Sequence, residues 1–550
     1  MKIALAQLNY HVGNFAANTQ KMIGAIERAE SENADIVVFS ELCISGYPAR
    51  DFLEFDDFIQ QCNDSLQTIA QHTHKVAALV GCPRRNPDLS GKDLLNSAFL
   101  LHEGTVKFIA DKTLLPNYDV FDEYRYFESN RNFAVAEFGG KKLAITICED
   151  IWDVALDSSG AETHNPLYTL CPLDEINKHQ PDIIINLSAS PFNYKQHESR
   201  LSVVKANVKR YGIPLVYVNQ VGSQTELIFD GGSMVVNNKA EVVQQLPFFE
   251  EGFSVVDTED LNRTTVHALP SATKRIHDSL VLGIRDYFKK LGFTKAILGL
   301  SGGIDSAVVL CLAAEALGRD NVLWLLLPSG FSTEHSLSDA IALANNTNTR
   351  YETVPIEENF RALLNTLEPH FNGLPFNVAE ENLQARVRGV LLMAFSNKFG
   401  YILLNTTNKS EAAVGYGTLY GDMCGGLSVL GDVYKTQVYE LAEYINRNEE
   451  IIPRNIITKA PSAELRPNQK DSDSLPDYAV LDSILFEYIE KRKGPREIIE
   501  MGFDAHTVNR TLKMVNANEW KRFQAPPILR VSTKAFGMGR RMNIEGKYLG

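Results

Sequence analysis

Short, continuous apolar runs recur along the first half of the chain. They are rich in β-branched residues, which predicts strands that are buried on both faces. The runs cover residues 3–8, 35–40, 142–147, 182–187, 214–218 and 232–236. Helical periodicity separates some of them, at 18–33 and 199–211. This alternation predicts an α/β layered unit whose polar site residues lie at the ends of the strands.

The second half alternates regularly between helical and strand patterns. In chain order these are a helix over 277–291, a strand over 295–300, a helix over 305–317, a strand over 321–327, a helix over 332–346 and a strand over 351–354. Repeated βαβ units of this kind predict a doubly wound, Rossmann-like parallel sheet.

The two patterns meet at residues 257–275, which lack apolar periodicity and include Pro270. A chain of 550 residues is too long for one core and predicts two to four domains. We therefore expect one domain over 1–260, a linker over 261–275 and a second domain over 276–550.

The charge of the chain narrows the class of ligand. A formal net charge of −14 and an isoelectric point near 5.4 argue against a protein that wraps nucleic acid or lies on an anionic membrane.

Seven scattered cysteines without a Cys-x-x-Cys pair indicate reduced thiols, and neither a disulfide framework nor a zinc site. Residues 1–10 alternate like a strand and do not resemble a signal peptide, and no apolar run approaches the roughly 18 residues of a membrane span. We expect a cytoplasmic protein with small-molecule ligands.

The turn after the strand at 295–300 carries a candidate phosphate site. Two glycines in Gly299-Leu-Ser-Gly-Gly-Ile-Asp-Ser306 let backbone N–H groups and the hydroxyls of Ser301 and Ser306 converge on phosphate oxygens at a helix N-terminus. Asp305 is suited to hold Mg²⁺ there. The loop lacks the lysine of Gly-x-x-x-x-Gly-Lys-Ser/Thr and resembles the ATP pyrophosphatases, which cut ATP between the α and β phosphates. An ordinary Ser-Gly-Gly turn is the alternative.

Three strand-end residues in the first half form a second candidate site. They are Glu41 in Phe-Ser-Glu-Leu-Cys, Lys112 in Ala-Asp-Lys-Thr-Leu and Cys148 in Ile-Thr-Ile-Cys-Glu-Asp. Each alone has an ordinary interpretation as a solvated charge or a buried small apolar residue. Together, in these contexts, they resemble the Glu-Lys-Cys triad of the nitrilase-type carbon–nitrogen hydrolases. The resemblance covers roughly residues 1–260 and implies an α-β-β-α sandwich.

Amide hydrolysis explains the three residue types. Cys148 attacks the amide carbon as a thiolate, and Glu41 takes the thiol proton, passes it to departing ammonia and then activates water. Lys112 stabilises the oxyanion, with Glu123 as a candidate to orient it. The resemblance implies that three further residues recognise the amide substrate, which we expect to be glutamine. These are Tyr118, Ser190 and Lys195.

Four later motifs in the second half resemble those of a known family. They cover residues 405–411, 415–426, 431–436 and 459–467. With the glycine loop and the triad, they resemble the glutamine-dependent NAD synthetase family over nearly the full chain. The resemblance implies a homo-oligomer that uses ammonia from glutamine to amidate ATP-adenylated deamido-NAD, giving NAD, AMP, pyrophosphate and glutamate, with Mg²⁺ as cofactor.

The same resemblance assigns binding roles by position. For ATP these are Gly299, Leu300, Ser301, Gly302, Gly303, Ile304, Asp305, Ser306, Thr406 and Lys435. For deamido-NAD they are Asn382, Glu411, Asp422 and Lys521, and for Mg²⁺ they are Asp305 and Glu411. Arg386 and Arg388 are either phosphate contacts or salt-bridged helix residues, and Lys521 is equally consistent with a solvated face. The polar, proline-containing segment 460–477 is expected to be a mobile loop over a site.

Three other functions fit parts of this pattern. A different glutamine amidotransferase would use the same adenylate chemistry on another acceptor. An RNA-modifying or RNA-binding protein would use a related loop, although the acidic charge opposes this. A regulatory protein with an inactive amidase half is the third.

Overall fold

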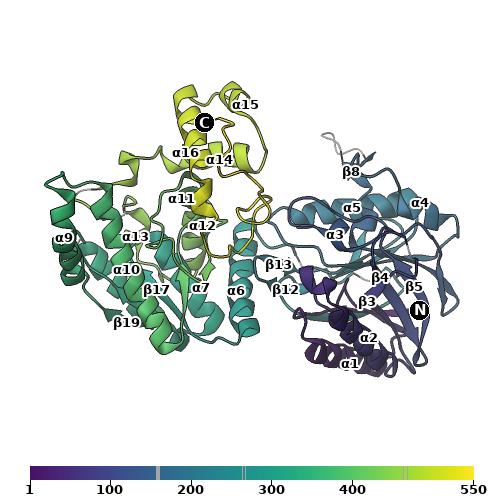
Figure 1. Ribbon diagram of the computed structural model, residues 1–550. Helices are drawn as coiled ribbons and strands as arrows, with labels where there is room; N and C mark the ends of the chain where they lie inside the picture. Colours follow the sequence, from purple (N-terminus) through teal and green to yellow (C-terminus); the bar gives the residue numbers. More distant parts are fainter. Residues whose placement is uncertain are drawn as a thin grey trace. The chain divides into compact units, whose positions relative to one another are not determined.

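The computed structural model describes the chain except for Leu89, residues 157–161, Arg263, His267, Thr333, Ala463, Asn468 and Gly550. It divides into two compact units, Met1–Leu269 and Pro270–Gly550 (Figure 1). Among the described residues, no helix combines the length and the apolar character that a bilayer span needs.

Two six-stranded sheets form the centre of the first unit. The first has the order β16-β1-β2-β3-β4-β5 and the second has the order β15-β14-β11-β10-β7-β6. The strands of the first sheet are β1 (Lys2–Gln7), β2 (Ile36–Val38), β3 (Ala77–Arg85), β4 (Leu94–His102), β5 (Thr105–Asp111) and β16 (Gly252–Asp257). Those of the second are β6 (Ala136–Phe138), β7 (Lys141–Ile147), β10 (Ile183–Ser188), β11 (Leu215–Asn219), β14 (Met234–Val236) and β15 (Val242–Gln245).

Helices cover the outer faces of both sheets. These are α1 (Phe15–Ser31) and α2 (Asp56–Ala70) on one side, and α4 (Pro172–Asn177) and α5 (Gln196–Tyr211) on the other. Alternate residues of β1 enter different cores: Ile3 and Leu5 pack between the sheets, whereas Ala4 and Ala6 pack under the helices. Both faces of the strand are therefore buried, which explains the continuous apolar runs. The predicted α-β-β-α sandwich is confirmed.

Shorter elements complete the first unit. They are η1 (Arg50–Glu54), α3 (Glu123–Tyr126), η2 (Cys148–Ile151) and the strand pairs β8 (Val154–Leu156) with β9 (Glu162–His164) and β12 (Val221–Gln224) with β13 (Leu227–Asp230).

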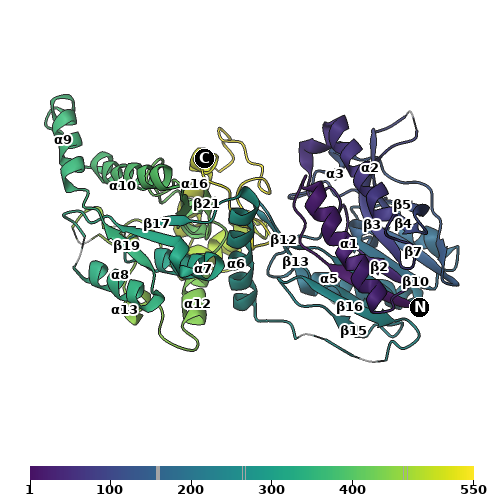
Figure 2. The ribbon, with the colours of Figure 1, turned by 90° about the horizontal axis from the view of Figure 1, so that it is seen from below.

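A five-stranded, fully parallel sheet of order β19-β18-β17-β20-β21 forms the centre of the second unit. Its strands are β17 (Ala296–Leu300), β18 (Val322–Leu326), β19 (Arg350–Thr353), β20 (Ile402–Asn405) and β21 (Leu427–Ser428). Figure 2 shows helix α10 (Val378–Phe399) on one side of this sheet and α7 (Ile304–Leu317), α8 (Glu334–Thr347) and α12 (Lys435–Ile445) on the other. The predicted doubly wound sheet is confirmed.

The strand order reverses at β17, because β18 lies on one side of it and β20 on the other. Such a switch point opens a crevice at the carboxyl ends of the strands, where ligands bind in this architecture. The glycine loop leaves β17 at this end.

The remaining elements of the second unit are mostly helical. They are α6 (Ala272–Leu291), η3 (Arg319–Asn321), α9 (Glu357–Phe371), α11 (Lys409–Val414), α13 (Arg454–Thr458), η4 (Asp471–Asp473), α14 (Tyr478–Ile489), α15 (Pro495–Glu500), α16 (Ala505–Ala517) and α17 (Glu519–Arg522). Helix α6 begins at Ala272, earlier than the predicted start at 277, because the Ser271 hydroxyl caps it by accepting the Lys274 N–H at 3.2 Å.

Candidate active sites

In the first unit, the ammonium group of Lys112 lies between two buried carboxylates. Lys112 Nζ is 2.7 Å from Glu41 Oε1 and 2.7 Å from Glu123 Oε2. All three side chains are at most 5% exposed. Burial alone would lower the pKa of Lys112, but the charges of Glu123 and Glu41 raise it well above its usual range. Lys112 is therefore held as a cation.

Neighbouring polar groups fix the two carboxylates. Asn96 Nδ2 donates to Glu41 Oε1 at 2.8 Å, and the Ala189 N–H donates to Glu41 Oε2 at 3.1 Å. The Tyr47 hydroxyl donates to Glu123 Oε1 at 2.9 Å. Burial, opposed by Lys112, raises the pKa of Glu123 to about 7. These groups leave Glu41 little freedom to turn.

Cys148 lies at the end of β7, where the backbone turns sharply. Its φ is +44°, in the left-handed region that non-glycine residues rarely adopt. Burial first, and then the charge of Glu41, raise the pKa of the Cys148 thiol well above its usual range, while Lys112 lowers it. The charges of the predicted triad thus act on the sulfur.

Asp150 ties this turn to the residues that follow Lys112. One carboxylate oxygen accepts the N–H groups of Thr113 at 2.9 Å and Leu114 at 2.8 Å. The other accepts the N–H of Ile147 at 3.0 Å. Three backbone donors on one buried carboxylate fix the Cys148 turn relative to the segment that follows Lys112.

Glu149, the residue after Cys148, receives hydrogen bonds from two tyrosines. The Tyr118 hydroxyl donates to Glu149 Oε1 at 2.9 Å and the Tyr168 hydroxyl donates to the same oxygen at 2.5 Å. The Tyr118 side chain is 40% exposed. The predicted glutamine contact Tyr118 thus borders the Cys148 turn.

The other predicted glutamine contacts lie on the segment between β10 and α5. Ser190 follows the residue whose N–H contacts Glu41, and its own N–H donates to Asn219 Oδ1 at 2.9 Å. Its hydroxyl accepts from Arg200 Nη2 at 3.3 Å. Lys195 immediately precedes α5, and its ammonium group lies 5.8 Å from the ring centre of Tyr194.

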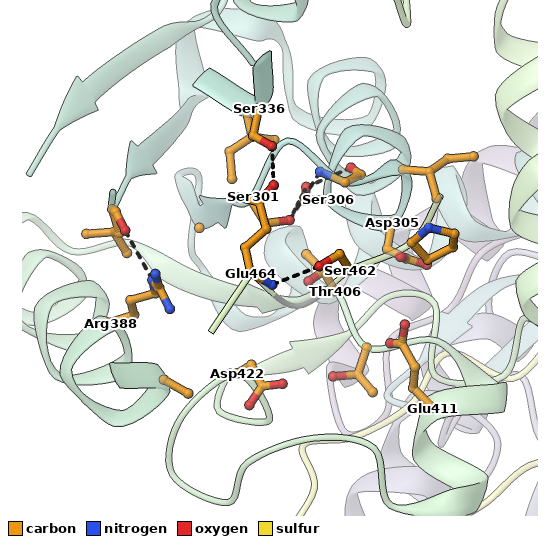
Figure 3. Close-up of a pocket in the computed structure, with 18 of the residues that line it drawn as sticks. Ser301, Asp305, Ser306, Ser336, Arg388, Thr406, Glu411, Asp422, Ser462 and Glu464 are labelled. Carbon is orange, nitrogen blue, oxygen red and sulfur yellow. Dashed lines mark hydrogen bonds between the residues drawn. The ribbon is translucent and has the colours of Figure 1, made fainter. Parts of the chain in front are cut away.

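In the second unit, a cavity of about 280 Å³ opens at the carboxyl ends of β17 and β20. In Figure 3, Ser301, Asp305 and Ser306 of the glycine loop lie on one side, and Glu411 and Asp422 lie on the other. Nine of the ten predicted ATP residues line it: Gly299, Leu300, Ser301, Gly303, Ile304, Asp305, Ser306, Thr406 and Lys435.

The tenth, Gly302, supports the loop from behind. Its φ is +73°, and a Cβ at this position would lie 2.6 Å from the carbonyl oxygen of Ser336 in α8. Only glycine fits such a contact. Within the loop, the Gly303 N–H donates to Ser301 Oγ at 3.2 Å, and Ser306 Oγ donates to the Gly303 carbonyl at 3.0 Å. The loop is thus held in a curved form.

Two carboxylates share one cation at the edge of the cavity. Lys435 forms an ion pair with Asp305, and its Nζ lies 3.4 Å from Glu411 Oε1. Asn408 Nδ2 donates to the other oxygen of Asp305 at 2.9 Å. Burial and then the charge of Asp305 raise the pKa of Glu411 to about 8. Two carboxyl groups that converge beside the phosphate loop offer the oxygen ligands that Mg²⁺ takes in proteins.

The predicted deamido-NAD contacts divide into two groups. Glu411 and Asp422 line the cavity, and Asp422 Oδ1 accepts the Thr418 N–H at 2.7 Å. Asn382 and Lys521 lie outside the described lining and contact the segment at its edge. Asn382 Oδ1 accepts from Thr418 Oγ1 at 2.7 Å, and Lys521 Nζ donates to the Gly415 and Gly417 carbonyls at 2.8 and 3.0 Å.

The two arginines of α10 make different contacts. Arg388 lines the cavity and donates to the Leu327 carbonyl at 3.1 Å. Arg386 donates to the Leu419 carbonyl at 3.2 Å. Both contacts are with backbone oxygens, and the two roles considered for these arginines, phosphate contact and salt-bridged helix residue, stay predictions.

Residues of the 460–477 segment line the cavity at Ala460, Pro461, Ser462, Glu464, Leu465 and Asp471. Just before it, Lys459 Nζ donates to Ser336 Oγ at 2.6 Å, and Ser336 Oγ donates to Glu464 Oε1 at 2.5 Å. The sequence assigned no role to Ser336, Glu464 or Asn96, since only the fold brings them to the sites. Lys459 and Glu464 both belong to the 459–467 motif, which was the available sequence signal for them.

The folds and sites together define a class: an amidase-like unit followed by an ATP-pyrophosphatase-like unit. Family models agree, matching carbon-nitrogen hydrolase over residues 2–158 and NAD synthase over residues 276–525.

Comparison with individual proteins is more specific. The chain is 45% identical to the glutamine-dependent NAD(+) synthetase of Synechocystis sp. over 98% of both chains, and 39% identical to that of Aquifex aeolicus over the whole of both. The solved glutamine-dependent NAD+ synthetase of Acinetobacter baumannii, in complex with ADP, superposes with a TM-score of 0.78 at 37% identity, covering 99% of this chain and 98% of that one. The chain belongs to the glutamine-dependent NAD(+) synthetase family.

Proposed function

We propose that the chain hydrolyses glutamine and uses the ammonia to amidate deamido-NAD, with ATP as co-substrate and NAD, AMP, pyrophosphate and glutamate as products. The supporting observation is the full-length similarity to glutamine-dependent NAD(+) synthetases, because it covers both units together. We assign glutamine hydrolysis to residues 1–260 and NAD synthesis to residues 276–550, joined by 261–275.

Glutamine hydrolysis begins with proton transfer from Cys148 to Glu41. The raised pKa of the thiol means that the resting cysteine keeps its proton, so attack on the amide carbon requires this base. Lys112, 2.7 Å from Glu41 Oε1, stabilises the oxyanion of the tetrahedral intermediate. Glu41 then gives its proton to departing ammonia and activates the water that cleaves the thioester. Glu123 positions Lys112.

We assign glutamine recognition to Tyr118, Ser190 and Lys195. Tyr118 borders the Cys148 turn through Glu149, and Ser190 follows the residue whose N–H fixes Glu41. Lys195 adds a positive charge at the start of α5, which suits the α-carboxylate of an amino acid.

In the second unit, the glycine loop from Gly299 to Ser306 binds the ATP phosphates, with Thr406 and Lys435 at its side. The nicotinate carboxylate attacks the α-phosphorus, pyrophosphate leaves, and ammonia then displaces AMP. Asp305 and Glu411 would hold the Mg²⁺, which would supply neutralisation of phosphate charge when bound. Asn382, Glu411, Asp422 and Lys521 bind deamido-NAD, of which Asn382 and Lys521 position the 415–418 segment.

An assay with ATP, glutamine and deamido-NAD tests the proposal. The expected result is one NAD and one AMP for each pyrophosphate formed. Another glutamine amidotransferase would form no NAD with deamido-NAD, and that result would exclude the proposed substrate. We further propose a cytoplasmic homo-oligomer without nucleic-acid or membrane partners. A monomer in light scattering would contradict the oligomer.

A further inference from the structure

A cluster of metal-ligand side chains lies in the first unit, apart from the triad. Asp153, His164 and Cys171 each offer one ligand atom, and these atoms lie within 4.8 Å of one another. Cys171 Sγ is 3.9 Å from His164 Nδ1. Sulfur, ring nitrogen and carboxylate oxygen are the ligands that Zn²⁺ takes in proteins. A search for Cys-x-x-Cys spacing cannot detect this cluster, because only one ligand is a cysteine.

The buried carboxylate of Asp153 faces the Cys171 thiol, with which it interacts. Asp153 is fully buried, and its Oδ1 accepts no hydrogen bond of normal geometry from the part of the chain that the structure describes. Its other oxygen lies 3.5 Å from Arg210 Nη1, but that guanidinium is shared with Asp174 at 2.6 Å. The charge of this buried carboxylate is thus only weakly paired with an arginine, and a bound cation would compensate it.

The two ring nitrogens of His164 face different partners. Its Nε2 faces the carbonyl oxygen of Tyr168, which can only accept a hydrogen bond, so Nε2 carries the proton. In the neutral ring Nδ1 then has a free lone pair, on the side of Cys171. Histidines that bind metals usually donate their other N–H to a carbonyl or carboxylate in this way.

Backbone contacts hold Asp153 and His164 close together. Val154 pairs with His164 in the β8–β9 ladder, and the Asn165 N–H donates to the Asp153 carbonyl at 2.6 Å. Tetrahedral Zn²⁺ holds its ligand atoms about 3.5 Å apart. The required contraction is thus small enough for side-chain rotation. His164 is exposed and Cys171 is partly exposed, so an ion can enter from solvent.

We propose that Asp153, His164 and Cys171 bind one Zn²⁺, with water as the fourth ligand. Cys171 releases its thiol proton to solvent on binding, and the two anionic ligands then balance the charge of the ion. The ion fixes Tyr168, whose backbone contacts His164 and whose hydroxyl donates to Glu149 at 2.5 Å. Zinc thereby stabilises the border of the Cys148 site. This last effect, unlike the metal site, rests on the proposed function.

Zinc binding is measured on the full chain after chelator treatment, with excess Mg²⁺ present to occupy the oxygen-rich site of the second unit. The wild type should bind one equivalent of Zn²⁺ in competition with a chromogenic chelator. Its Co²⁺ complex should show a sulfur-to-cobalt charge-transfer band. Cys171→Ser should lose that band, and Cys171→Ser and His164→Gln should each weaken binding at least tenfold. Cys311→Ser, a change at another partly exposed cysteine, should match the wild type.

The proposal is overturned if the wild type binds Zn²⁺ no more tightly than Cys171→Ser and His164→Gln, or if its Co²⁺ complex lacks the thiolate band. His164→Gln changes an exposed side chain, so its zinc affinity tests the proposal even if Cys171→Ser misfolds. Zinc removal should reduce kcat/KM for glutamine about tenfold without affecting NAD formation from ammonium. Unchanged kcat/KM for glutamine would contradict the proposed effect of zinc on Tyr168. Binding is measured without substrates, so failure of the proposed function is seen separately.

Discussion

Lys112 shows how neighbouring charges set the state of one buried side chain. Glu41 and Glu123 both lie 2.7 Å from its ammonium group, and all three groups are shielded from water. The pKa of Glu123 is about 7, because burial opposes its ionisation more than Lys112 favours it. Near neutral pH, Glu123 therefore changes between a charged and an uncharged partner of Lys112.

Glu123→Gln should lower kcat for glutamine hydrolysis about 10- to 100-fold, because the amide keeps the shape but not the charge that orients Lys112. Wild-type hydrolysis should decrease as the pH falls through about 7 and Glu123 takes up a proton. The variant should lose this dependence. Glutamate release, measured at a series of pH values around 7, reports both effects. A variant whose activity still decreases as the pH falls through about 7 would contradict them. NAD formation from ammonium is the control.

Gly302→Ala should weaken ATP binding and destabilise the second unit by about 1–3 kcal/mol, since the added Cβ meets the Ser336 carbonyl at 2.6 Å. Activity should fall with glutamine and with ammonium alike. Gly292→Ala is a matched control, because Gly292 also has a positive φ but no atom within 4 Å of its Cβ position. Thermal unfolding and ATP titration compare the two. Equal effects would show that backbone strain, and not the contact with α8, decides the outcome.

At the scale of the elements, strand ends carry the first site and a strand-to-helix turn carries the second. Asp150 joins the end of β7 to the segment after β5 by accepting three backbone N–H groups. Lys112 and Cys148 come from these two segments. Their separation therefore depends on this carboxylate.

Asp150→Asn should destabilise the first unit by about 1–3 kcal/mol, because an amide NH₂ in place of one oxygen leaves a buried backbone donor unsatisfied. Asp182→Asn is the control, since Asp182 also accepts a backbone N–H, from Lys142 at 2.7 Å, but at an exposed position. Its cost should be much smaller. Denaturant unfolding compares the two midpoints, and equal losses would contradict the role given to Asp150.

The sequence predicted best those strands that are buried on both faces. β1, β7, β10 and β11 match continuous apolar runs. β4 was not predicted, because Asn96 and Ser97 interrupt its apolar pattern, and the structure shows that Asn96 contacts Glu41. β5 was not predicted either, since its residues are largely exposed or half-buried. A polar residue inside a strand weakens the pattern at the place where it serves the site.

The main residues of the two candidate sites could also be predicted from the sequence, because each lies in a short, continuous motif. Their partners were not, because contacts such as Ser336 with Glu464 join residues far apart in the chain. Spacing carries no information about such pairs, and only the packing of α8 against the 460–477 segment brings them together.

At the scale of the whole molecule, two compact units carry two chemistries that share one intermediate. By the proposed function, the thiol and base of the first unit release ammonia, and the phosphate loop of the second unit supports adenylation. Each unit has its own hydrophobic cores. Loss of one chemistry should therefore leave the other intact.

Cys148→Ala should abolish NAD formation from glutamine, by at least about 10³-fold, because no other thiol can form the thioester. NAD formation from added ammonium should stay within about twofold of the wild type. Cys62→Ala, at a buried cysteine outside the sites, is the control. Loss of both activities in a folded Cys148→Ala protein would contradict independent sites, and full glutamine-driven activity would indicate an inactive amidase half.

Isotope transfer tests the central claim most directly. The intact chain is supplied with ATP, deamido-NAD and glutamine labelled with ¹⁵N at its amide, and the NAD is analysed by mass spectrometry. The account predicts that the carboxamide of the NAD product carries the label. NAD without the label, formed while labelled glutamine is hydrolysed, would contradict it.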